Sequence, residues 1–525
     1  MRILDRPAVI ALSVASLCLL VDTKLLIQHL HYPIYHFDGP ASVLYIPMVL
    51  NVCALWLILT GVFVFAQRPG KPRIVIWLGV ILFLPWTLLA SYCSVRGNAL
   101  PHLLSLTFFL ISLTAYVVLL ILWRPSFESH FERIRGFIAT LLSFGAISGA
   151  LILAQLLWFA WCARSLNDPP PLHHSQLGSL NQSPSPRVIW IVLDELSYQQ
   201  TFEKRYPGLK LPAFDQLASE STVFTHVIPT GIYTQNVIPS LMTGIHVDII
   251  KSSLNGQLSV HNSSSDSWQR FNQHDTIFQD ALDDGYSTAV AGWFNPYCRI
   301  MPGVLDHCFW TFHESNGMFT SESFLVNLLA PAEGFIERAL SFAFFKHAPV
   351  SDTRLDTRLH AGDYHSLYGA GDRLLTDRSA NFVFLHMPVP HQGGIYNRRT
   401  STFARSPSSY IDNLALADHY LAHVRQVLEQ QGTWDSSVII VMGDHSWRTV
   451  LVWRGSPYWT PEDEIASDGG QFDDRPGYIV KMPYQQKAVQ IDTPFAALRT
   501  RALLDAVINH KISSANDLAT WVKQK

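Results

Sequence analysis

Charged residues are scarce in this chain of 525 residues. Asp, Glu, Lys and Arg make up 15% of the sequence and hydrophobic residues 48%, whereas soluble globular proteins are typically about 25% charged. The formal net charge is only −3, and the sequence contains no run of basic residues. The net charge therefore does not indicate a surface that binds polyanions, and no nucleic-acid partner is expected.

The missing charge is explained by the first third of the chain, where five long apolar segments follow one another. They run over residues 8–29, 43–66, 74–95, 103–123 and 137–162, and the last four contain no Asp, Glu, Lys or Arg. Each is close to or above the ~20 residues that a helix needs to span the hydrocarbon core of a membrane. The first segment has no small-residue cleavage site and is followed by further spans, so it does not resemble a cleaved signal peptide. The pattern predicts an α-helical transmembrane bundle of five spans over residues 1–162.

Basic residues are distributed unevenly over the ends and loops of these segments. Those on one side are Arg2, Arg6, Arg68, Lys71, Arg73, Arg124, Arg133 and Arg135, whereas the alternate loops contain only Arg96. The positive-inside rule then puts the N-terminus in the cytoplasm. An odd number of spans leaves everything after Cys162 on the other side. The expected location is the inner (cytoplasmic) membrane, multi-pass, with an extracytoplasmic and, in a Gram-negative bacterium, periplasmic domain.

The remainder of the chain has the pattern of a linker and an α/β domain. Residues 163–186 are rich in Pro, Ser and Asn and lack apolar periodicity, as linkers do. Short β-branched runs follow at 187–193, 287–293, 381–386 and 437–443, separated by helix-like stretches such as 411–430. This alternation predicts an α/β domain with a largely parallel central sheet over residues 187–525. In such sheets, ligands bind beyond the carboxyl ends of the strands.

One apolar stretch inside this domain, residues 323–346, does not fit a strand or a regular helix. Pro331, Gly334 and several charged residues interrupt it, so it is too broken to span a membrane. It reads equally as an insertion into the core of the domain or as an amphipathic segment resting on the membrane surface.

Cysteine is almost confined to the apolar segments. Of the six cysteines, only Cys298 and Cys308 lie in the polar part of the chain, where they close the loop CRIMPGVLDHC. In an oxidising compartment this pair is expected to form a disulfide. Two buried thiols are the alternative, and export of the domain favours the disulfide.

Polar clusters that could carry chemistry stand at or between the predicted strand ends. Asp194 comes directly after one apolar run, Asp444 and His445 come directly after another, and Thr234 lies in the segment PTGIYTQNVIPSLMTG. Two carboxylates and an imidazole suit a divalent cation such as Zn²⁺, although Mn²⁺ or Mg²⁺ would also accept the oxygens. A hydroxyl beside such an ion loses its proton near neutral pH and becomes a nucleophile. The sequence thus predicts a metal centre with Thr234 as its nucleophile.

Six segments in this order resemble the sulfatase and alkaline phosphatase superfamily. They are VIWIVLDE, LPAFDQLASESTVFTHVI, YTQNVIPSLMTG, TIFQDALDDGYSTAVAGW, FVFLHMPVPH and VIIVMGDHSW. Five spans followed by such a domain resemble the bacterial phosphoethanolamine transferases and the lipoteichoic acid synthases. Both families use a threonine nucleophile to take a phosphoryl headgroup from a membrane phospholipid and pass it to a glycan or lipid acceptor.

The resemblance implies roles for individual residues. Asp194 matches the opening metal ligand, Thr234 matches the nucleophile, and Asp444 with His445 matches the closing ligand pair. His391 matches a histidine that contacts the transferred group or a second metal.

Five further residues are implied to support this site. His386 and Glu195 could hold the metal ligands in place or bind a second metal, and Asn236, Trp447 and Arg448 could bind substrate. Arg448 reads equally as a partner for a phosphate or as a surface charge.

Two departures from the family patterns narrow the activity. Sulfatases mature a cysteine or serine to formylglycine, and the sequence TQNVI beginning at Thr234 offers neither. Phosphoethanolamine transferases carry a further histidine after the Asp-His pair. Here the next histidine is His510, and Asp468, Asp473 and Asp474 lie in the interval, where they could take its place.

The expected function is transfer of a phosphoethanolamine or phosphoglycerol headgroup through a covalent intermediate on Thr234. A membrane-tethered phosphodiesterase or phosphatase, with water as the acceptor, would use the same site chemistry. A sulfatase and an inactive scaffold are the less favoured alternatives, since threonine replaces the formylglycine precursor while the metal-ligand pattern is complete.

Overall fold

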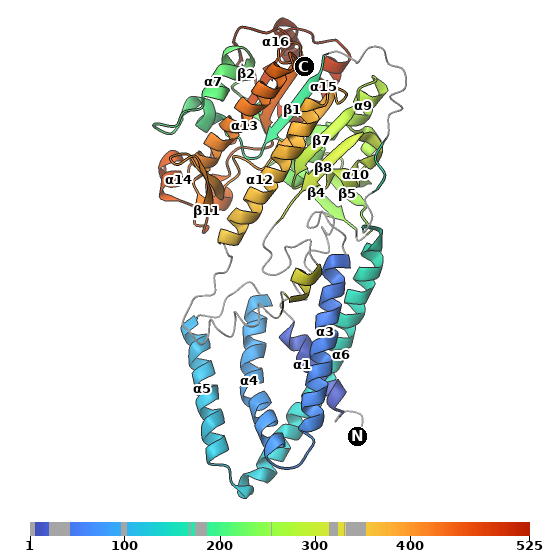
Figure 1. Ribbon diagram of the computed structural model, residues 1–525, viewed down its shortest axis with the longest axis vertical. Helices are drawn as coiled ribbons and strands as arrows, with labels where there is room; N and C mark the ends of the chain where they lie inside the picture. Colours follow the sequence, from blue (N-terminus) through green and yellow to red (C-terminus); the bar gives the residue numbers. More distant parts are fainter. Residues whose placement is uncertain are drawn as a thin grey trace. The chain divides into compact units, whose positions relative to one another are not determined.

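The computed structural model describes residues 6–19, 42–95, 102–166, 170–173, 186–253, 255–313, 324–329, 331 and 353–524. These residues fall into two compact units, which are considered separately. Unit 1 contains the described helices up to residue 166 and the residues around 324–329. Unit 2 contains the described residues 170–313 and 353–524 (Figure 1).

Unit 1 is helical. Its long elements are α1 (Pro7–Cys18), α3 (Ser42–Phe65), α4 (Lys71–Val95), α5 (His102–Ile121) and α6 (Glu128–Cys162). Two helical stretches, Ser42–Phe65 and Pro125–Leu166, are long and apolar enough to cross a membrane. They overlap the predicted spans 43–66 and 137–162 and indicate a membrane anchor. The predicted span 8–29 lies only partly within the described residues.

Small residues allow α1 and α6 to pack closely. A Cβ atom added at Gly145 would lie 2.4 Å from Ser13 Oγ, and one added at Gly149 would lie 2.4 Å from Ser16 Oγ. Small residues spaced four apart let the backbones of two apolar helices approach, which supplies the van der Waals contact that drives helix association in lipid. The sequence GAISG in α6 therefore fixes where α1 packs.

An ion-paired cluster joins two of the basic segments of unit 1. Glu132 Oε1 accepts a hydrogen bond from Arg73 Nη1 at 3.0 Å, and Glu132 Oε2 accepts one from Arg135 Nε at 2.8 Å. Arg73 lies in the first turn of α4 and Arg135 lies in α6. The predicted loops around residues 68–73 and 124–135 are therefore brought together at one end of the unit.

The described part of the apolar stretch 323–346 contacts α3. Residues 324–329 are helical. Asn327 Nδ2 donates to Val43 O at 3.1 Å, and Asn51 Nδ2 donates to Leu328 O at 2.9 Å. This segment therefore packs on a candidate membrane span within unit 1, and most of the remainder of 323–346 lies outside the described residues.

Unit 2 is built on an eight-stranded sheet in the order β14-β2-β13-β12-β1-β9-β7-β8. The bounds in that order are Val489–Ile491, Thr222–Phe224, Tyr478–Lys481, Val438–Gly443, Val188–Leu193, Phe382–Met387, Thr288–Trp293 and His307–Thr311. Strand β13 is antiparallel to both neighbours, and all other pairs are parallel. The prediction of an α/β domain with a largely parallel sheet is confirmed.

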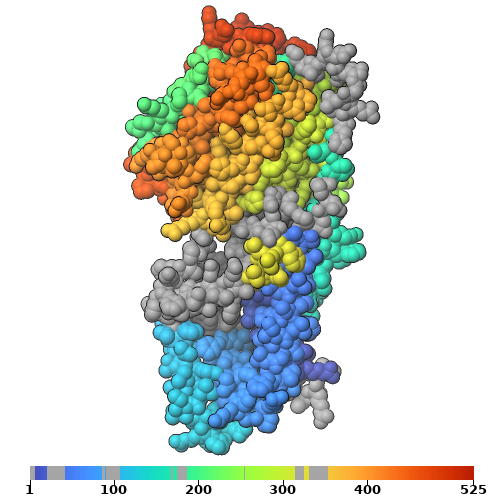
Figure 2. Space-filling model, in the orientation of Figure 1, coloured from blue at the N-terminus to red at the C-terminus, as the bar shows by residue number. Residues whose placement is uncertain are grey.

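The four predicted strands form the centre of this sheet. Every residue of β12, β1, β9 and β7 is buried, because helices cover both faces of a parallel sheet. Helices α12 (Thr353–Thr376) and α13 (Tyr410–Gln430) lie side by side, with α12 against β7, β8 and β9 (Figure 1). They form the broad yellow-to-orange surface of unit 2 in Figure 2. Helix α13 starts where the Ser409 side chain accepts a hydrogen bond from Asp412 N.

Further elements surround the sheet. The helices are α7 (Pro212–Ser219), α8 (Thr234–Thr243), α9 (Ile277–Asp283), α10 (Tyr297–Ile300), α14 (Pro461–Ala466), α15 (Thr500–Ile508) and α16 (Ala515–Lys523). Strands β4 (Ile249–Ser252), β5 (Leu258–Asn262) and β6 (Ser267–Arg270) form an antiparallel sheet of their own. Two small ladders pair β10 (Gly394–Asn397) with β11 (Thr402–Ser408) and β3 (Val227–Ile228) with β15 (Phe495–Ala496).

The register of the central strands positions the site. Leu193, the last residue of β1, lies opposite Gly443 of β12 and opposite Met387 of β9. The residues that follow, Asp194 and Asp444, therefore leave the sheet at the same edge, as expected for the carboxyl ends of parallel strands.

Candidate metal centre

Two buried aspartates at the strand ends form the base of the site. Asp194 and Asp444 are both fully buried. Asp444 Oδ1 accepts hydrogen bonds from Glu195 N at 3.0 Å and from His445 N at 2.8 Å. These two backbone donors fix the orientation of the carboxylate, so that Asp444 Oδ2 faces Thr234.

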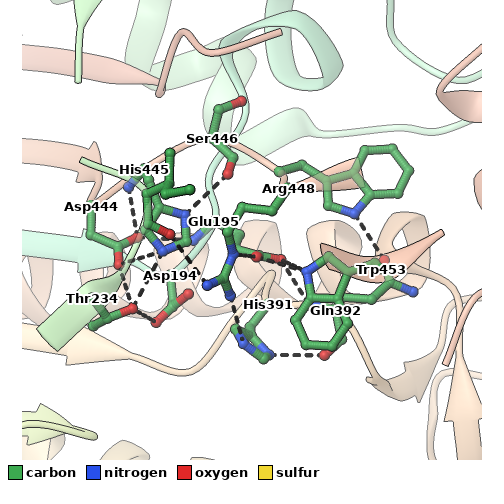
Figure 3. A network of polar contacts seen from close by, with 12 residues as sticks. Asp194, Glu195, Thr234, His391, Gln392, Asp444, His445, Ser446, Arg448 and Trp453 are labelled. Carbon is green, nitrogen blue, oxygen red and sulfur yellow. Dashed lines mark hydrogen bonds and ion pairs between the residues drawn. The ribbon is translucent and has the colours of Figure 1, made fainter. Parts of the chain in front are cut away.

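Thr234 is the first residue of α8, and its hydroxyl lies among three acceptor atoms. Oγ1 is 2.8 Å from Asp444 Oδ2, 3.1 Å from Asp194 Oδ2 and 3.4 Å from His445 Nε2 (Figure 3). One hydroxyl proton can serve only one of these atoms at a time. The N-terminal end of a helix also favours negative charge, so α8 would stabilise a deprotonated Thr234 oxygen.

His445 presents an unprotonated nitrogen to this cluster. His445 Nδ1 lies 3.1 Å from the carbonyl oxygen of Ser446, and a carbonyl only accepts, so Nδ1 carries the proton. Nε2 therefore carries no proton, and its lone pair is available to a metal ion. This atom lies 3.2 Å from Asp444 Oδ2. Burial, with a smaller contribution from the nearby Arg448, lowers the pKa of His445 to about 3. The ring is therefore neutral near pH 7 and in the tautomer that metal-binding histidines adopt.

His386 of β9 approaches the same carboxylates from the neighbouring strand. Its Nδ1 is 2.7 Å from the Tyr297 hydroxyl, and its Nε2 is 3.7 Å from Asp194 Oδ2. Nε2 is buried without a hydrogen-bond partner among the described residues. Burial lowers the pKa of His386 to about 4. The ligand atoms of Asp194, His386 and Asp444 all lie within 4.8 Å of one another, so His386 is in direct reach of the centre.

The residues present fit a divalent cation. Burial raises the pKa of Asp194 and of Asp444, and the Asp444 charge raises that of Asp194 further. Asp194 Oδ1 is buried without a hydrogen-bond partner among the described residues. Two carboxylate charges close together in a dry site are unfavourable unless a cation neutralises them. Oxygen and nitrogen donors of this kind suit Zn²⁺ and accept Mn²⁺.

Glu195 is engaged by other groups. Its carboxylate forms an ion pair with Arg448 Nε, and its Oε1 accepts from Trp453 Nε1 at 2.8 Å. Its Oε2 accepts from Gln392 N at 3.1 Å. Both oxygens are thus occupied beside the centre, and Glu195 is not one of the three residues whose ligand atoms cluster there.

Arg448 connects this ion pair to His391. The arginine is buried, with 7% of its surface exposed, and is not the surface charge that the sequence also allowed. Its Nη1 donates to Ile232 O at 3.3 Å, and its Nη2 lies 3.3 Å from His391 Nε2 (Figure 3). His391 Nδ1 is 2.8 Å from Gln392 O, so Nδ1 is protonated and Nε2 accepts from the arginine. Burial and the Arg448 charge hold the pKa of His391 well below its usual range.

Asn236 and Trp447, the other two residues predicted to bind substrate, contact neighbouring residues of the protein. Asn236 Nδ2 donates to Asp248 O at 2.5 Å, which ties α8 to the segment before β4. Trp447 is buried, stacks on Tyr410 with ring centroids 4.2 Å apart, and donates from Nε1 to Gln392 Oε1 at 2.9 Å. These two residues are therefore placed to support the site.

The acidic residues considered as replacements for a missing histidine are not part of the centre. Asp473 forms hydrogen bonds with Arg475, and Asp468, Asp474 and His510 are exposed. None of them is among the residues whose ligand atoms cluster at the described site.

The two cysteines of the polar part form a disulfide in the structure. The Cys298 and Cys308 sulfur atoms are 2.07 Å apart. The bond joins α10 to β8, and α10 carries Tyr297, which contacts His386.

Several residues around the centre have no signal in the sequence. Tyr297 and Trp453 reach His386 and Glu195 from separate segments. Only Gln392 could have been noticed, since it follows His391 directly.

The buried pair of Glu195 and Arg448 allows a stability prediction. Replacing either partner leaves the other charge buried without its ion-pair partner, and breaking a buried pair in this way typically costs about 3–5 kcal/mol. We expect Glu195→Gln and Arg448→Met each to lower the free energy of unfolding by about 3 kcal/mol. The double variant should lose clearly less than the sum of the two. Denaturant unfolding of the metal-saturated protein measures all three values, and strictly additive losses would show that the two side chains do not interact.

Comparison with known proteins adds the following. The family model described as Sulfatase matches residues 186–520. Similar solved structures include the phosphonate monoester hydrolase of Agrobacterium radiobacter (15% identity, 62% of this chain and 74% of that chain, TM-score 0.38). A second is the lipoteichoic acid synthase LtaP from Listeria monocytogenes (15% identity, 60% of this chain and 70% of that chain, TM-score 0.34). A third is an alkaline phosphatase superfamily protein from Vibrio parahaemolyticus (15% identity, 67% of this chain and 74% of that chain, TM-score 0.34). No curated protein matches the chain.

Proposed function

Since this chain belongs to the sulfatase family, a branch of the metal-dependent alkaline phosphatase superfamily, we propose that it transfers a phosphoryl headgroup from a membrane phospholipid to a glycan or lipid acceptor. The observation that carries the proposal is the position of Thr234 Oγ1, within 3.4 Å of Asp194, Asp444 and His445. Oxidation of a threonine cannot give the formylglycine aldehyde of sulfatases. A threonine alkoxide can attack phosphorus directly.

The side chains divide the work as follows. Asp194, Asp444 and His445, with His386 in reach, would hold a divalent cation, which when bound supplies positive charge and lowers the pKa of a neighbouring hydroxyl. Of the three acceptors around Thr234 Oγ1, Asp444 Oδ2 is the nearest at 2.8 Å, and it would accept the hydroxyl proton.

The transfer proceeds in two displacements. In the first, a bond forms between Thr234 Oγ1 and the phosphorus of the headgroup. The phosphorus–oxygen bond to diacylglycerol breaks, and diacylglycerol leaves with the proton that Thr234 gives up. In the second, the hydroxyl of the acceptor attacks phosphorus, the bond to Thr234 breaks, and Thr234 regains a proton.

A membrane anchor suits a lipid donor. The two helices long and apolar enough to cross a membrane support an anchor, and we propose that five spans over residues 1–162 and a linker over 163–186 hold the catalytic domain, residues 187–525, outside the inner membrane. The donor would be a phosphatidylethanolamine or a phosphatidylglycerol, and the ion a zinc ion.

The test is to incubate the purified full-length protein, loaded with zinc, with phosphatidylethanolamine labelled in its headgroup. We expect release of diacylglycerol and a labelled adduct on the tryptic peptide that contains Thr234, detected by mass spectrometry. Phosphatidylglycerol in a parallel reaction distinguishes the two headgroups. Neither diacylglycerol nor an adduct with either lipid would refute the proposed transfer.

A hydrolase is the second candidate, because the same residues would activate Thr234 with water as the final acceptor. Family membership supports this reading equally well. Turnover that is undiminished when every glycan and lipid acceptor is omitted would favour the phosphodiesterase or phosphatase.

A further inference from the structure

A cavity of about 480 Å³ lies in unit 2 beside the sheet of β4, β5 and β6. The residues that line it come from the turn between β4 and β5, from β5 and β6, from the segment that follows β6, and from α10 and the residues after it. Its volume falls within the range of about 300–1,000 Å³ that is usual for sites of small molecules. The polar side chains that matter here are Asn255, Gln257, Arg270, Asn272, Gln273 and Arg299.

The cavity carries positive charge. Arg270 and Arg299 both line it, and none of its lining residues is an aspartate or a glutamate. Arg270 is exposed and forms no ion pair with any residue that the structure describes. Arg299 of α10 lies over the ring of Trp310 of β8, 5.2 Å from its centroid, and this contact holds the guanidinium group against β8. Guanidinium groups bind carboxylates and phosphates through paired hydrogen bonds.

The amide side chains add further donors. Gln273 Oε1 accepts a hydrogen bond from Gly303 N at 2.8 Å, and Asn272 Oδ1 accepts one from His274 N at 3.2 Å. Asn255 Oδ1 accepts one from the Ser253 hydroxyl. Because these three oxygens are already used, the amides offer mainly their NH₂ groups to a ligand. The lining is therefore rich in donors and suits a ligand rich in acceptor oxygens.

The cavity is distinct from the metal centre, although both involve α10. Tyr297 contacts His386 at the metal centre, while Arg299 lines the cavity. Residues two apart on a helix do not face each other, so α10 presents these two side chains in different directions. The Cys298–Cys308 disulfide joins this helix to β8.

We infer that this cavity binds a small polyhydroxylated anion, namely a sugar that carries a carboxylate or a phosphate. The guanidinium groups of Arg270 and Arg299 bind the anionic group, and the amide NH₂ groups bind the hydroxyls. This site does not depend on the reaction at Thr234, because binding at the cavity needs neither the metal nor the nucleophile.

The experiment is calorimetric titration of the full-length, metal-loaded protein with glucuronate, with glucose 6-phosphate and with glucose. We expect both anions to bind and glucose to bind at least about tenfold more weakly, since a charged hydrogen bond contributes roughly that much or more. Arg270→Ala and Arg299→Ala should each weaken the binding of both anions at least about tenfold. Arg405→Ala, an exposed arginine on β11, is the matched control and should bind as the wild type does.

The variants separate the cavity from the metal centre. Anion binding that is equal in Arg270→Ala and in the wild type would place the ligand elsewhere and overturn the inference. So would equal affinities for glucose and glucuronate, or no binding of either anion to the wild type. Because Arg270 is exposed and makes no ion pair with a described residue, its replacement should leave the thermal unfolding midpoint unchanged, which shows that the variant is folded.

Discussion

Thr234→Ala should lower turnover of the phospholipid donor by at least about 1000-fold, since removal of a nucleophile removes the covalent route altogether. The structure gives the reason at atomic detail. Thr234 Oγ1 is the hydroxyl oxygen that lies 2.8 Å from Asp444 Oδ2 and 3.1 Å from Asp194 Oδ2. The alanine variant should also show no adduct on the peptide around residue 234, and steady-state release of diacylglycerol with adduct mass spectrometry measures both effects.

Two further variants give this prediction its controls. Thr234→Ser keeps a hydroxyl at the same position and should retain most of the turnover. Thr243→Ala makes the same chemical change at the other end of α8, where Oγ1 donates to Pro239 O at 2.7 Å. It should cost about 1 kcal/mol of stability, the usual value of such a hydrogen bond, and leave turnover intact. An alanine variant at Thr234 that turns over as fast as Thr243→Ala would remove the threonine from the mechanism.

The fold of unit 2 could be predicted because its strands are buried on both faces. Runs such as VIWIVL in β1 and VIIVMG in β12 are apolar at every position, which is typical of parallel strands beneath two layers of helices. The predicted ranges 187–193 and 437–443 agree with these strands to within a residue. The order of strands in the sheet could not be read, because pairing depends on contacts between distant segments that no local pattern encodes.

The metal centre was predictable only in part, for a related reason. Asp194, Asp444 and His445 directly follow strands, and the carboxyl ends of parallel strands meet at one edge. His386 lies inside β9, where its neighbours are apolar, and its approach to Asp194 depends on the register Val192↔His386. Register is a property of the pair of strands, so the sequence left the role of His386 open.

The surroundings of Glu195 show most clearly what could not be predicted from the sequence. Its neighbour in sequence, Asp194, points into the centre, while Glu195 pairs with Arg448 and accepts from Trp453. Glu195 has a φ of +65°, a conformation that few residues other than glycine adopt. Such a backbone turn separates two adjacent carboxylates, and nothing in the pair of letters DE signals it.

Asp444→Asn should have opposite effects on the metal-free and the metal-loaded protein. Without metal, the substitution removes one of two buried like charges and should raise the free energy of unfolding by about 1–3 kcal/mol. The amide fits, because its oxygen keeps the hydrogen bonds from Glu195 N and His445 N. Its NH₂ group then donates to His445 Nε2 or to Thr234 Oγ1, the atoms that now face Asp444 Oδ2.

With zinc bound, the wild type should be more stable than Asp444→Asn. The wild type gains about 2.7 kcal/mol at a metal concentration 100 times the dissociation constant, and Asp444→Asn should gain little because it lacks a charged ligand. Thermal unfolding with EDTA and with excess zinc measures both states. Asp463→Asn is the control, since both oxygens of Asp463 accept from donors, among them Tyr410 N and Gln392 Nε2. An asparagine there must turn an NH₂ group toward a donor, so stability should fall equally with and without metal.

The pH dependence of the stability difference between Asp444→Asn and the wild type tests whether the two buried carboxylates repel each other. Folding raises the pKa of Asp444 through burial, so the folded wild type holds its proton up to a higher pH than the unfolded chain does. The wild type without metal therefore loses stability as the pH rises from the unfolded carboxyl pKa of about 3.9 to the higher pKa of Asp444 in the folded protein. Over this pH range the stability advantage of the asparagine variant should grow. An asparagine variant that is less stable than the wild type in EDTA at pH 7 would mean that the two carboxylates do not repel each other, and the argument for a cation between them would fail.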